Sequence, residues 1–320
     1  MIISASRRTD LPARYSEWLI NRFSEGFVYV RNPVSVHQVS KVSLSPDVVD
    51  GIVFWTKNPE PLLNKLDVFK DYAYYFQITA NAYGVDIEPN IPSKNDVIVP
   101  SIQRLSDIIG PKRVIWRYDP IVLNADHPKE YHYKYFEKMA KMLSGYVRRC
   151  TFSFVDLYKN TERNTRSLGI QRITEEDMLE IGQRFSEIAQ AYGLQLNTCA
   201  EAINLARFGI EHACCIDRAI FEEISGFHIK AVKDPNQRPE CGCIASIDIG
   251  MYNTCTNGCK YCYANSNAST ARKKSEQHDP KAPLLIGTIS PDDKLTDRKM
   301  KSMKQGQLSL LEIGGTHEGF

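Results

Sequence analysis

Short apolar segments alternate with longer amphipathic ones over the first two thirds of the chain. The apolar segments are rich in β-branched and aromatic residues, which is typical of strands, whereas the amphipathic ones repeat their apolar positions at helical spacing. Thr174 and Asp177 add the spacing of a capping box, which predicts a helix start. The predicted strands are residues 2–6, 27–30, 51–56, 74–79, 113–118, 151–155 and 194–198, and the predicted helices are residues 16–25, 60–69, 101–109, 133–143 and 175–192.

Strands that alternate with helices of this length predict βαβ units and a parallel sheet. With an eighth strand at residues 246–249, the chain has enough strands to close a (β/α) barrel, and an open doubly wound sheet is the alternative. The chain has no GxGxxG motif after a strand and no GxxxxGK[ST] motif, so dinucleotide-binding and P-loop folds lack their main signal. We therefore predict an α/β fold with a TIM-like barrel.

Several predicted strands end in charged residues that a purely structural strand does not need. In (β/α) barrels the carboxyl ends of the strands build the active site, although helix caps and salt bridges explain many such residues equally well. Arg117 could bind an anionic substrate group, or it could pair with Asp119. The candidate catalytic residues at this edge are Arg117, Asp119, Asp156 and Glu201.

Composition narrows the classes of function only a little. The chain is 42% hydrophobic and 24% charged, as globular proteins are, and its net charge of +2 gives no electrostatic indication of a nucleic acid or a membrane surface. It has no apolar stretch near the roughly 20 residues that span a membrane, and its opening MIISASRRTD has no secretory signal. We expect a cytoplasmic protein without a membrane partner, while nucleic acid stays open as a partner.

The cysteines are the unusual feature, because nine occur and seven of them lie between Cys214 and Cys262. In a reducing compartment, clustered cysteines are more often metal ligands or catalytic groups than disulfides. Cys255, Cys259 and Cys262 form the pattern CxxxCxxC, and Gly258 lets this loop turn tightly. Three thiolates from one loop would leave one iron of a [4Fe-4S] cluster without a protein ligand, and an open metal position is where chemistry occurs.

The segment CTNGCKYC at residues 255–262 resembles the CxxxCxΦC signature of radical S-adenosylmethionine (SAM) enzymes, in which Φ is aromatic. The resemblance implies that Cys255, Cys259 and Cys262 hold a [4Fe-4S] cluster, with Tyr261 and Tyr263 at the SAM site. It also implies that the cluster, reduced by a flavodoxin or ferredoxin, cleaves SAM to a 5′-deoxyadenosyl radical. This radical would abstract hydrogen from a substrate, small or macromolecular, that the resemblance does not identify.

The whole chain, with SASRRTD near its start and the cysteine loop near its end, resembles an uncharacterised bacterial family, DUF1848. Radical SAM proteins usually carry the motif after the first barrel strand, whereas only 58 residues follow Cys262 here. A circular permutation would account for this difference, because a closed barrel has no privileged first strand. On this hypothesis Asp10, or a backbone carbonyl near it, approaches the amino group of SAM, and Arg7 or Arg8 approaches its carboxylate.

The remaining cysteines allow a second site. Cys150 and Cys214 are expected to be small core residues. Four others could hold an auxiliary iron–sulfur cluster or a structural zinc, with burial in the core as the alternative. These four are Cys199, Cys215, Cys241 and Cys243.

We divide the chain into a barrel body (residues 1–212), a cysteine-rich segment that closes it (213–268) and a polar, partly disordered tail (269–320) in which residues 294–304 form a solvated helix. We also expect His37, His127 and His132 to be solvated. Two other functions compete with radical SAM chemistry. In one, Cys241 or Cys243 completes a closed structural metal site, and in the other the protein repairs nucleic acid as spore photoproduct lyase does.

Overall fold

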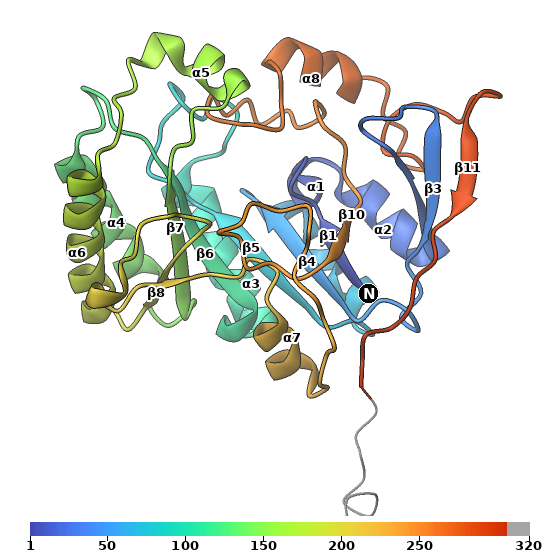
Figure 1. Ribbon diagram of the computed structural model, residues 1–320, viewed down its shortest axis with the longest axis horizontal. Helices are drawn as coiled ribbons and strands as arrows, with labels where there is room; N and C mark the ends of the chain where they lie inside the picture. Colours follow the sequence, from blue (N-terminus) through green and yellow to red (C-terminus); the bar gives the residue numbers. More distant parts are fainter. Residues whose placement is uncertain (306–320) are drawn as a thin grey trace, which may run out of the picture.

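A parallel sheet of eight strands forms the centre of the computed structural model, which describes residues 1–305 (Figure 1). The strand order is β10-β1-β4-β5-β6-β7-β8-β9, so the last strand of this sheet in the chain pairs with the first. The strands are β1 (Ile2–Ala5), β4 (Gly51–Thr56), β5 (Tyr74–Thr79), β6 (Val114–Ile121), β7 (Arg149–Phe154), β8 (Gln195–Thr198), β9 (Glu211–His212) and β10 (Ser246–Asp248).

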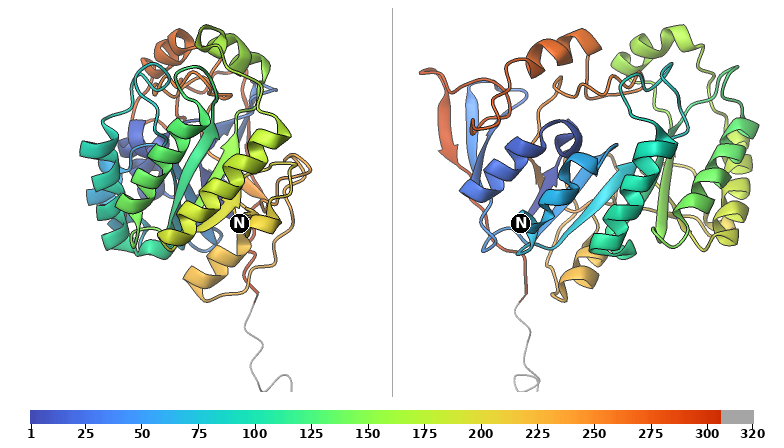
Figure 2. Two further views of the ribbon diagram at one scale, coloured as in Figure 1. Left: turned by 90° about the vertical axis from the view of Figure 1, so that its left-hand side faces the viewer. Right: turned by 180° about the vertical axis from the view of Figure 1, so that it is seen from behind.

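Helices cover one face of this sheet, the face turned toward the viewer in the right-hand view of Figure 2. The predicted helix at residues 60–69 is present as a 3₁₀ helix, and the capping box at Thr174 and Asp177 is confirmed. The helices are α1 (Leu11–Arg14), α2 (Ser16–Glu25), η1 (Glu60–Phe69), α3 (Val99–Ile109), α4 (Lys129–Leu143) and α6 (Glu175–Ala191), while α5 (Lys159–Thr165), α7 (Arg218–Ser225) and α8 (Ala268–Ser275) lie around the edges.

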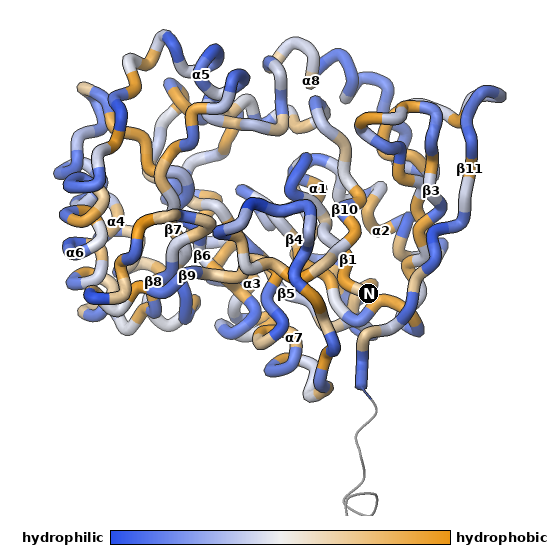
Figure 3. The backbone as a smooth tube through the Cα atoms, viewed as in Figure 1, coloured by the Kyte–Doolittle hydropathy of each residue, from blue (hydrophilic) through white to orange (hydrophobic). Residues whose placement is uncertain are grey.

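Successive residues of each strand face opposite sides of the sheet, and both sides are buried. Phe54 and Trp116 belong to the large core under the helices, whereas Val53, Tyr75 and Ile115 belong to a smaller core on the other face. A parallel sheet covered on both faces has nearly continuous apolar strands, which explains the apolar runs of the sequence. Figure 3 shows these runs in orange at the centre of the molecule.

Residues 213–245, which include α7, cover the second face. Tyr75 donates its hydroxyl, and Gln77 its amide, to the Cys215 carbonyl at 2.7 and 3.0 Å. This segment runs between the two edge strands, β9 and β10, which do not pair with each other within residues 1–305. The α/β class and the parallel sheet are confirmed. Among residues 1–305, hydrogen bonds between β9 and β10 do not close the sheet into a barrel.

A second, three-stranded sheet corrects the predicted strand count. β2 (Phe27–Arg31) pairs antiparallel with β3 (Gln38–Ser43), and β11 (Lys294–Asp297) pairs parallel with β3. Residues 27–30 therefore form a strand outside the main sheet, and the eighth main strand is the short β9. Apolar alternation identifies a strand, but it does not identify the sheet that the strand joins.

The described part of the predicted tail belongs to the fold. Trp18 donates to the Ala282 carbonyl at 2.8 Å, and Leu284 and Leu285 are buried. The helix predicted at residues 294–304 is wrong, because β11 occupies residues 294–297. Residues 306–320 of the predicted tail lie outside the described residues. Among residues 1–305, no helix is long and apolar enough to cross a membrane.

Two of the three histidines expected in solvent are buried. His132 is 0% exposed, and its ring nitrogens lie 2.9 Å from the Tyr118 hydroxyl and 2.9 Å from the Val122 carbonyl. His127 is buried against Tyr131, and only His37 is exposed as expected. Polar neighbours in the sequence suggested solvation, but α4 turns His132 toward the core. Burial lowers the pKa of His132 to about 4.

The protein should therefore lose stability in mild acid. Below pH 6.5 the unfolded chain protonates His132 while the folded chain keeps it neutral, so the free energy of unfolding falls as the pH drops from 6.5 toward 4, by about 3 kcal/mol over that range. In His132→Gln this part of the pH dependence should disappear. Urea unfolding at several pH values measures it, with His37→Gln as the matched control. Equal slopes for wild type and His132→Gln would contradict the assignment.

Candidate functional site

The cysteine loop begins directly after β10, at the carboxyl edge of the parallel sheet. Ser4 pairs with Asp248 in the β1–β10 register, and the Asp248 carboxylate accepts from the Ser4 hydroxyl at 3.0 Å and from the Arg7 backbone N–H at 2.8 Å. Gly250 permits this approach, because a Cβ there would lie 2.2 Å from the Ser6 hydroxyl oxygen. The residues after β10 and those after β1 therefore meet in one place.

Hydrogen bonds to its backbone carbonyls shape the cysteine loop. Gly258 has a φ of +75°, and a Cβ there would lie 3.1 Å from the Asn90 amide nitrogen. Asn90 donates to the Thr256 carbonyl at 2.9 Å, and Asn265 donates to the Cys255 carbonyl at 2.7 Å. Because these contacts use the backbone of the loop, the thiols of Cys255, Cys259 and Cys262 are left to serve as ligands.

The three thiols lie in a shielded environment. Cys255 is buried, and Cys259 and Cys262 are partly buried. Burial raises the pKa of all three, that of Cys255 to about 12, and the Lys57 ammonium beside Cys259 opposes the effect there. A bound cation that displaces the thiol protons would remove this penalty.

The donor set fits an iron–sulfur cluster in its chemistry. Among residues 1–305, no three His, Cys, Asp or Glu side chains already have the arrangement of metal ligands. One loop nevertheless supplies three thiols, and all nine cysteines are free. In a cubane each cysteine binds a different iron atom, so its ligands stand further apart than those of a single ion. Cys255, Cys259 and Cys262 are the residues that would hold such a cluster.

Asp10 joins the loop after β1 to the cysteine loop. Its carboxylate caps α1 by accepting from the Ala13 N–H at 3.1 Å, and it accepts from the Lys57 N–H at 2.8 Å and the Asn257 amide at 2.9 Å. Burial raises the pKa of Asp10. Asp10 thus contacts the cysteine loop through Asn257, and its contact with SAM stays a prediction.

Arg7 and Arg8 lie on either side of the same junction. The Arg7 guanidinium is 3.9 Å from Asp234 and packs over Trp55, whereas that of Arg8 is 3.9 Å from Asp248 and packs over a neighbouring tyrosine. The exposed Tyr263 donates its hydroxyl to the Arg7 carbonyl at 2.9 Å. Both arginines and Tyr263 therefore line the edge of the cysteine loop.

Tyr261, the aromatic residue of the motif, is part of a buried charged group. Its hydroxyl donates to the Glu88 carboxylate and accepts from the Asn81 amide at 3.1 Å. Glu88 also pairs with Lys57 and Lys94, each at 2.7 Å. Burial by itself would raise the pKa of Glu88, but the two ammonium groups outweigh it and hold the pKa below its usual value.

Arg117 and Asp119 pair at the centre of the second face. The Arg117 guanidinium donates to the Asp119 carboxylate, which also accepts from the Ser153 hydroxyl. Arg117 further donates to Gln77 at 3.3 Å and packs over Trp55. Burial would raise the pKa of Asp119, but Arg117 outweighs it and lowers that pKa. The pairing that the sequence left open is present.

Glu201 and Asp156 lie next to this pair. Glu201 accepts from the Phe154 N–H at 2.9 Å, and burial raises the pKa of Glu201 to about 7. A carboxyl group with such a pKa is suited to donate and accept protons near neutrality. Asp156 is exposed and pairs with Arg238 at 2.7 Å. The carboxyl ends of β6, β7 and β8 thus bring the four predicted catalytic residues to one region.

The four cysteines of the predicted second site also come together. The Cys199 and Cys215 sulfur atoms are 3.2 Å apart, and Cys215, Cys241 and Cys243 belong to one buried cluster against which Cys199 packs. Cys150 instead lies in the large core on the other face of the sheet, as expected for a core residue. Cys214 is only partly buried.

Lys57, Glu88 and Lys94 are the site residues that the sequence analysis missed. Lys57 directly follows β4, so its position at a strand end was a usable signal. Glu88 and Lys94 lie in the long connection between β5 and α3, where no periodic pattern marks them. Only the folded chain shows that they surround Tyr261.

A known family matches most of the chain. The family described as Domain of unknown function (DUF1848) matches residues 2–264. The chain belongs to this family. The DUF1848 match includes the loop after β1 and the whole cysteine loop, and it ends before α8 and β11. No curated protein matches the chain.

The Glu88 group should contribute strongly to stability. Glu88→Gln would leave two buried ammonium groups without their carboxylate, so the free energy of unfolding should fall by about 3 kcal/mol or more. Urea unfolding measures the change. Glu60→Gln removes the exposed pair with Arg104 and should cost less than about 1 kcal/mol. Similar losses in the two variants would show that Glu88 has no special role.

Proposed function

We propose that this DUF1848 protein is a radical SAM enzyme whose [4Fe-4S] cluster is held by Cys255, Cys259 and Cys262. The observation that carries the proposal is the position of these cysteines, in one loop that directly follows a strand at the carboxyl edge of an all-parallel sheet. When bound and reduced, the cluster supplies the electron that cleaves SAM and generates the 5′-deoxyadenosyl radical. A flavodoxin or ferredoxin would be the reductant.

We also propose that the sheet is a circularly permuted radical SAM barrel. The parallel pairing of β10 with β1 supports this idea, because it makes the cluster strand the neighbour of the strand that leads into Arg7 and Asp10. In place of direct pairing between β9 and β10, residues 213–245 cover the sheet face between these edges. This covering segment would exclude water from the reacting groups.

The chain's own residues would bind SAM and substrate on the second face. Tyr261, held by Glu88, would support the adenine, and Arg7 or Arg8 would bind the carboxylate of SAM. Arg117, fixed by Asp119, offers an anchor for an anionic group of the substrate. Glu201, with its pKa of about 7, is the proton donor or acceptor that this region provides.

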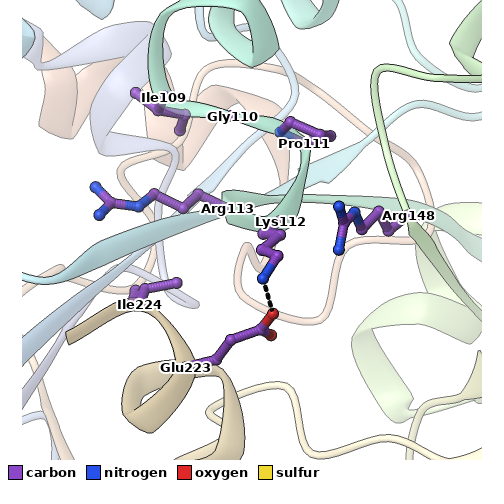
Figure 4. A pocket seen from close by; sticks show the side chains of 8 residues that line it. All are labelled: Ile109, Gly110, Pro111, Lys112, Arg113, Arg148, Glu223 and Ile224. Carbon is purple, nitrogen blue, oxygen red and sulfur yellow. Dashed lines mark ion pairs between the residues drawn. The ribbon is translucent and has the colours of Figure 1, made fainter. Parts of the chain in front are cut away.

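Two observations weigh against the competing functions. Cys241 and Cys243 lie with Cys199 and Cys215, so they are poorly placed to complete a closed site with the cysteine loop. The basic residues Lys112, Arg113 and Arg148 line a pocket at the amino ends of the strands, where Lys112 pairs with Glu223 (Figure 4). This pocket lies at the edge of the sheet opposite the cysteine loop.

Removal of one cluster ligand tests the chemistry. Anaerobically purified wild type should be brown, contain about four iron atoms per chain at this site and, when reduced, convert SAM to 5′-deoxyadenosine. Cys259→Ala should lose both the iron and the product, whereas Cys150→Ala should keep them. Iron analysis and chromatography of the nucleoside measure the outcome. A colourless wild type with stoichiometric zinc in place of iron would refute radical SAM chemistry.

Asp10 provides a separate test of the SAM position. Asp10→Asn preserves the size of the side chain but removes its charge, so it should keep the iron and weaken SAM binding at least about tenfold. Equilibrium binding of SAM to the reconstituted protein measures the affinity. Asp47→Asn, an exposed change far from the cysteine loop in the chain, is the control. Unchanged affinity in Asp10→Asn would remove Asp10 from the SAM site.

A further inference from the structure

Four cysteines from three separate segments meet on the second face of the sheet. Cys199 directly follows β8, Cys215 lies between β9 and α7, and Cys241 and Cys243 precede β10. The distance between the Cys199 and Cys215 sulfur atoms is 3.2 Å, and Cys215, Cys241 and Cys243 belong to one buried cluster against which Cys199 packs. The four cysteines therefore gather in one place, although they are more than 40 residues apart at the extremes of the sequence.

Hydrogen-bond donors and positive charge face these sulfur atoms. The buried Arg117 guanidinium donates to the Cys215 sulfur at 2.9 Å, and the Ile216 backbone N–H donates to the Cys243 sulfur at 3.3 Å. Neutral thiols are weak acceptors and do not need buried cations, whereas thiolates do. The surroundings therefore suit an anionic sulfur centre.

The spacing of the thiols favours a single ion over a cubane cluster. Zinc–sulfur bonds of about 2.3 Å place the sulfur atoms of a tetrahedral site about 3.8 Å apart, a little more than the 3.2 Å between the Cys199 and Cys215 sulfur atoms. The cysteines of a cubane stand further apart, because each binds a different iron. Among residues 1–305 no such group already has the arrangement of metal ligands, so the four side chains would turn toward one centre on binding.

We propose that Cys199, Cys215, Cys241 and Cys243 bind one zinc ion in a closed, four-thiolate site. Binding exchanges the four thiol protons for one Zn²⁺, and the resulting centre of charge −2 has the Arg117 guanidinium as a hydrogen-bond donor to the Cys215 sulfur. The ion would tie residues 213–245 to the end of β8 and hold this segment over the sheet face between β9 and β10. This site uses none of the three cysteines that would hold the cluster.

The test uses a protein that lacks the first cysteine site. Cys255→Ala/Cys259→Ala/Cys262→Ala, purified after growth with zinc, should retain about one zinc per chain after dialysis. Adding Cys215→Ala should reduce the zinc to less than about a tenth of that amount. Cys150→Ala and Cys214→Ala in the same background are the matched controls and should retain the zinc. Elemental analysis measures each protein.

A second measurement keeps the proposal testable if the triple variant does not fold. X-ray absorption at the zinc edge of wild type carrying its iron should show four sulfur neighbours at about 2.3 Å. Each of four results would overturn the proposal. Two concern wild type: no zinc with these cysteines freely reactive, or a Cys199–Cys215 disulfide. The other two are iron at cluster stoichiometry in the triple variant and loss of zinc in Cys214→Ala. If Cys259→Ala loses SAM cleavage but retains its zinc, the cluster site and the zinc site are separate.

Discussion

The parallel pairing of β10 with β1 is the interaction on which the candidate site depends. It brings the end of the DUF1848 region next to its beginning, with Asp248 accepting hydrogen bonds from both Ser4 and Arg7. The cysteine loop can then contact Asp10 through Asn257. Without this register, the three cysteines and the arginine-rich loop would have no common location.

The burial of both faces of the sheet explains where the chemistry lies. The face under the helices carries mostly apolar side chains, so the charged residues of the strands gather on the other face and at the carboxyl edge. There several charges are paired, as Arg117 is with Asp119 and Lys57 with Glu88. These pairs hold their side chains in fixed positions, which is what the binding of a reactive cofactor requires.

The covering segment of residues 213–245 has few regular elements of its own. It carries three of the four cysteines of the proposed zinc site and supplies the Cys215 carbonyl to Tyr75 and Gln77. A segment of this kind gains little stability from helix or strand hydrogen bonds. Its attachment through side chains and, on our proposal, through an ion would take the place of strand pairing between β9 and β10.

The sequence by itself determined the features that depend on neighbours along the chain. Alternating apolar segments predicted seven strands and the α/β class, and the spacing of Cys255, Cys259 and Cys262 predicted a shared loop. The tertiary structure decided which distant residues meet. It moved β2 into a second sheet, buried His132 and placed Glu88 against Tyr261. These contacts join residues far apart in the sequence. Strand order and register determine them, and no local pattern encodes strand order or register.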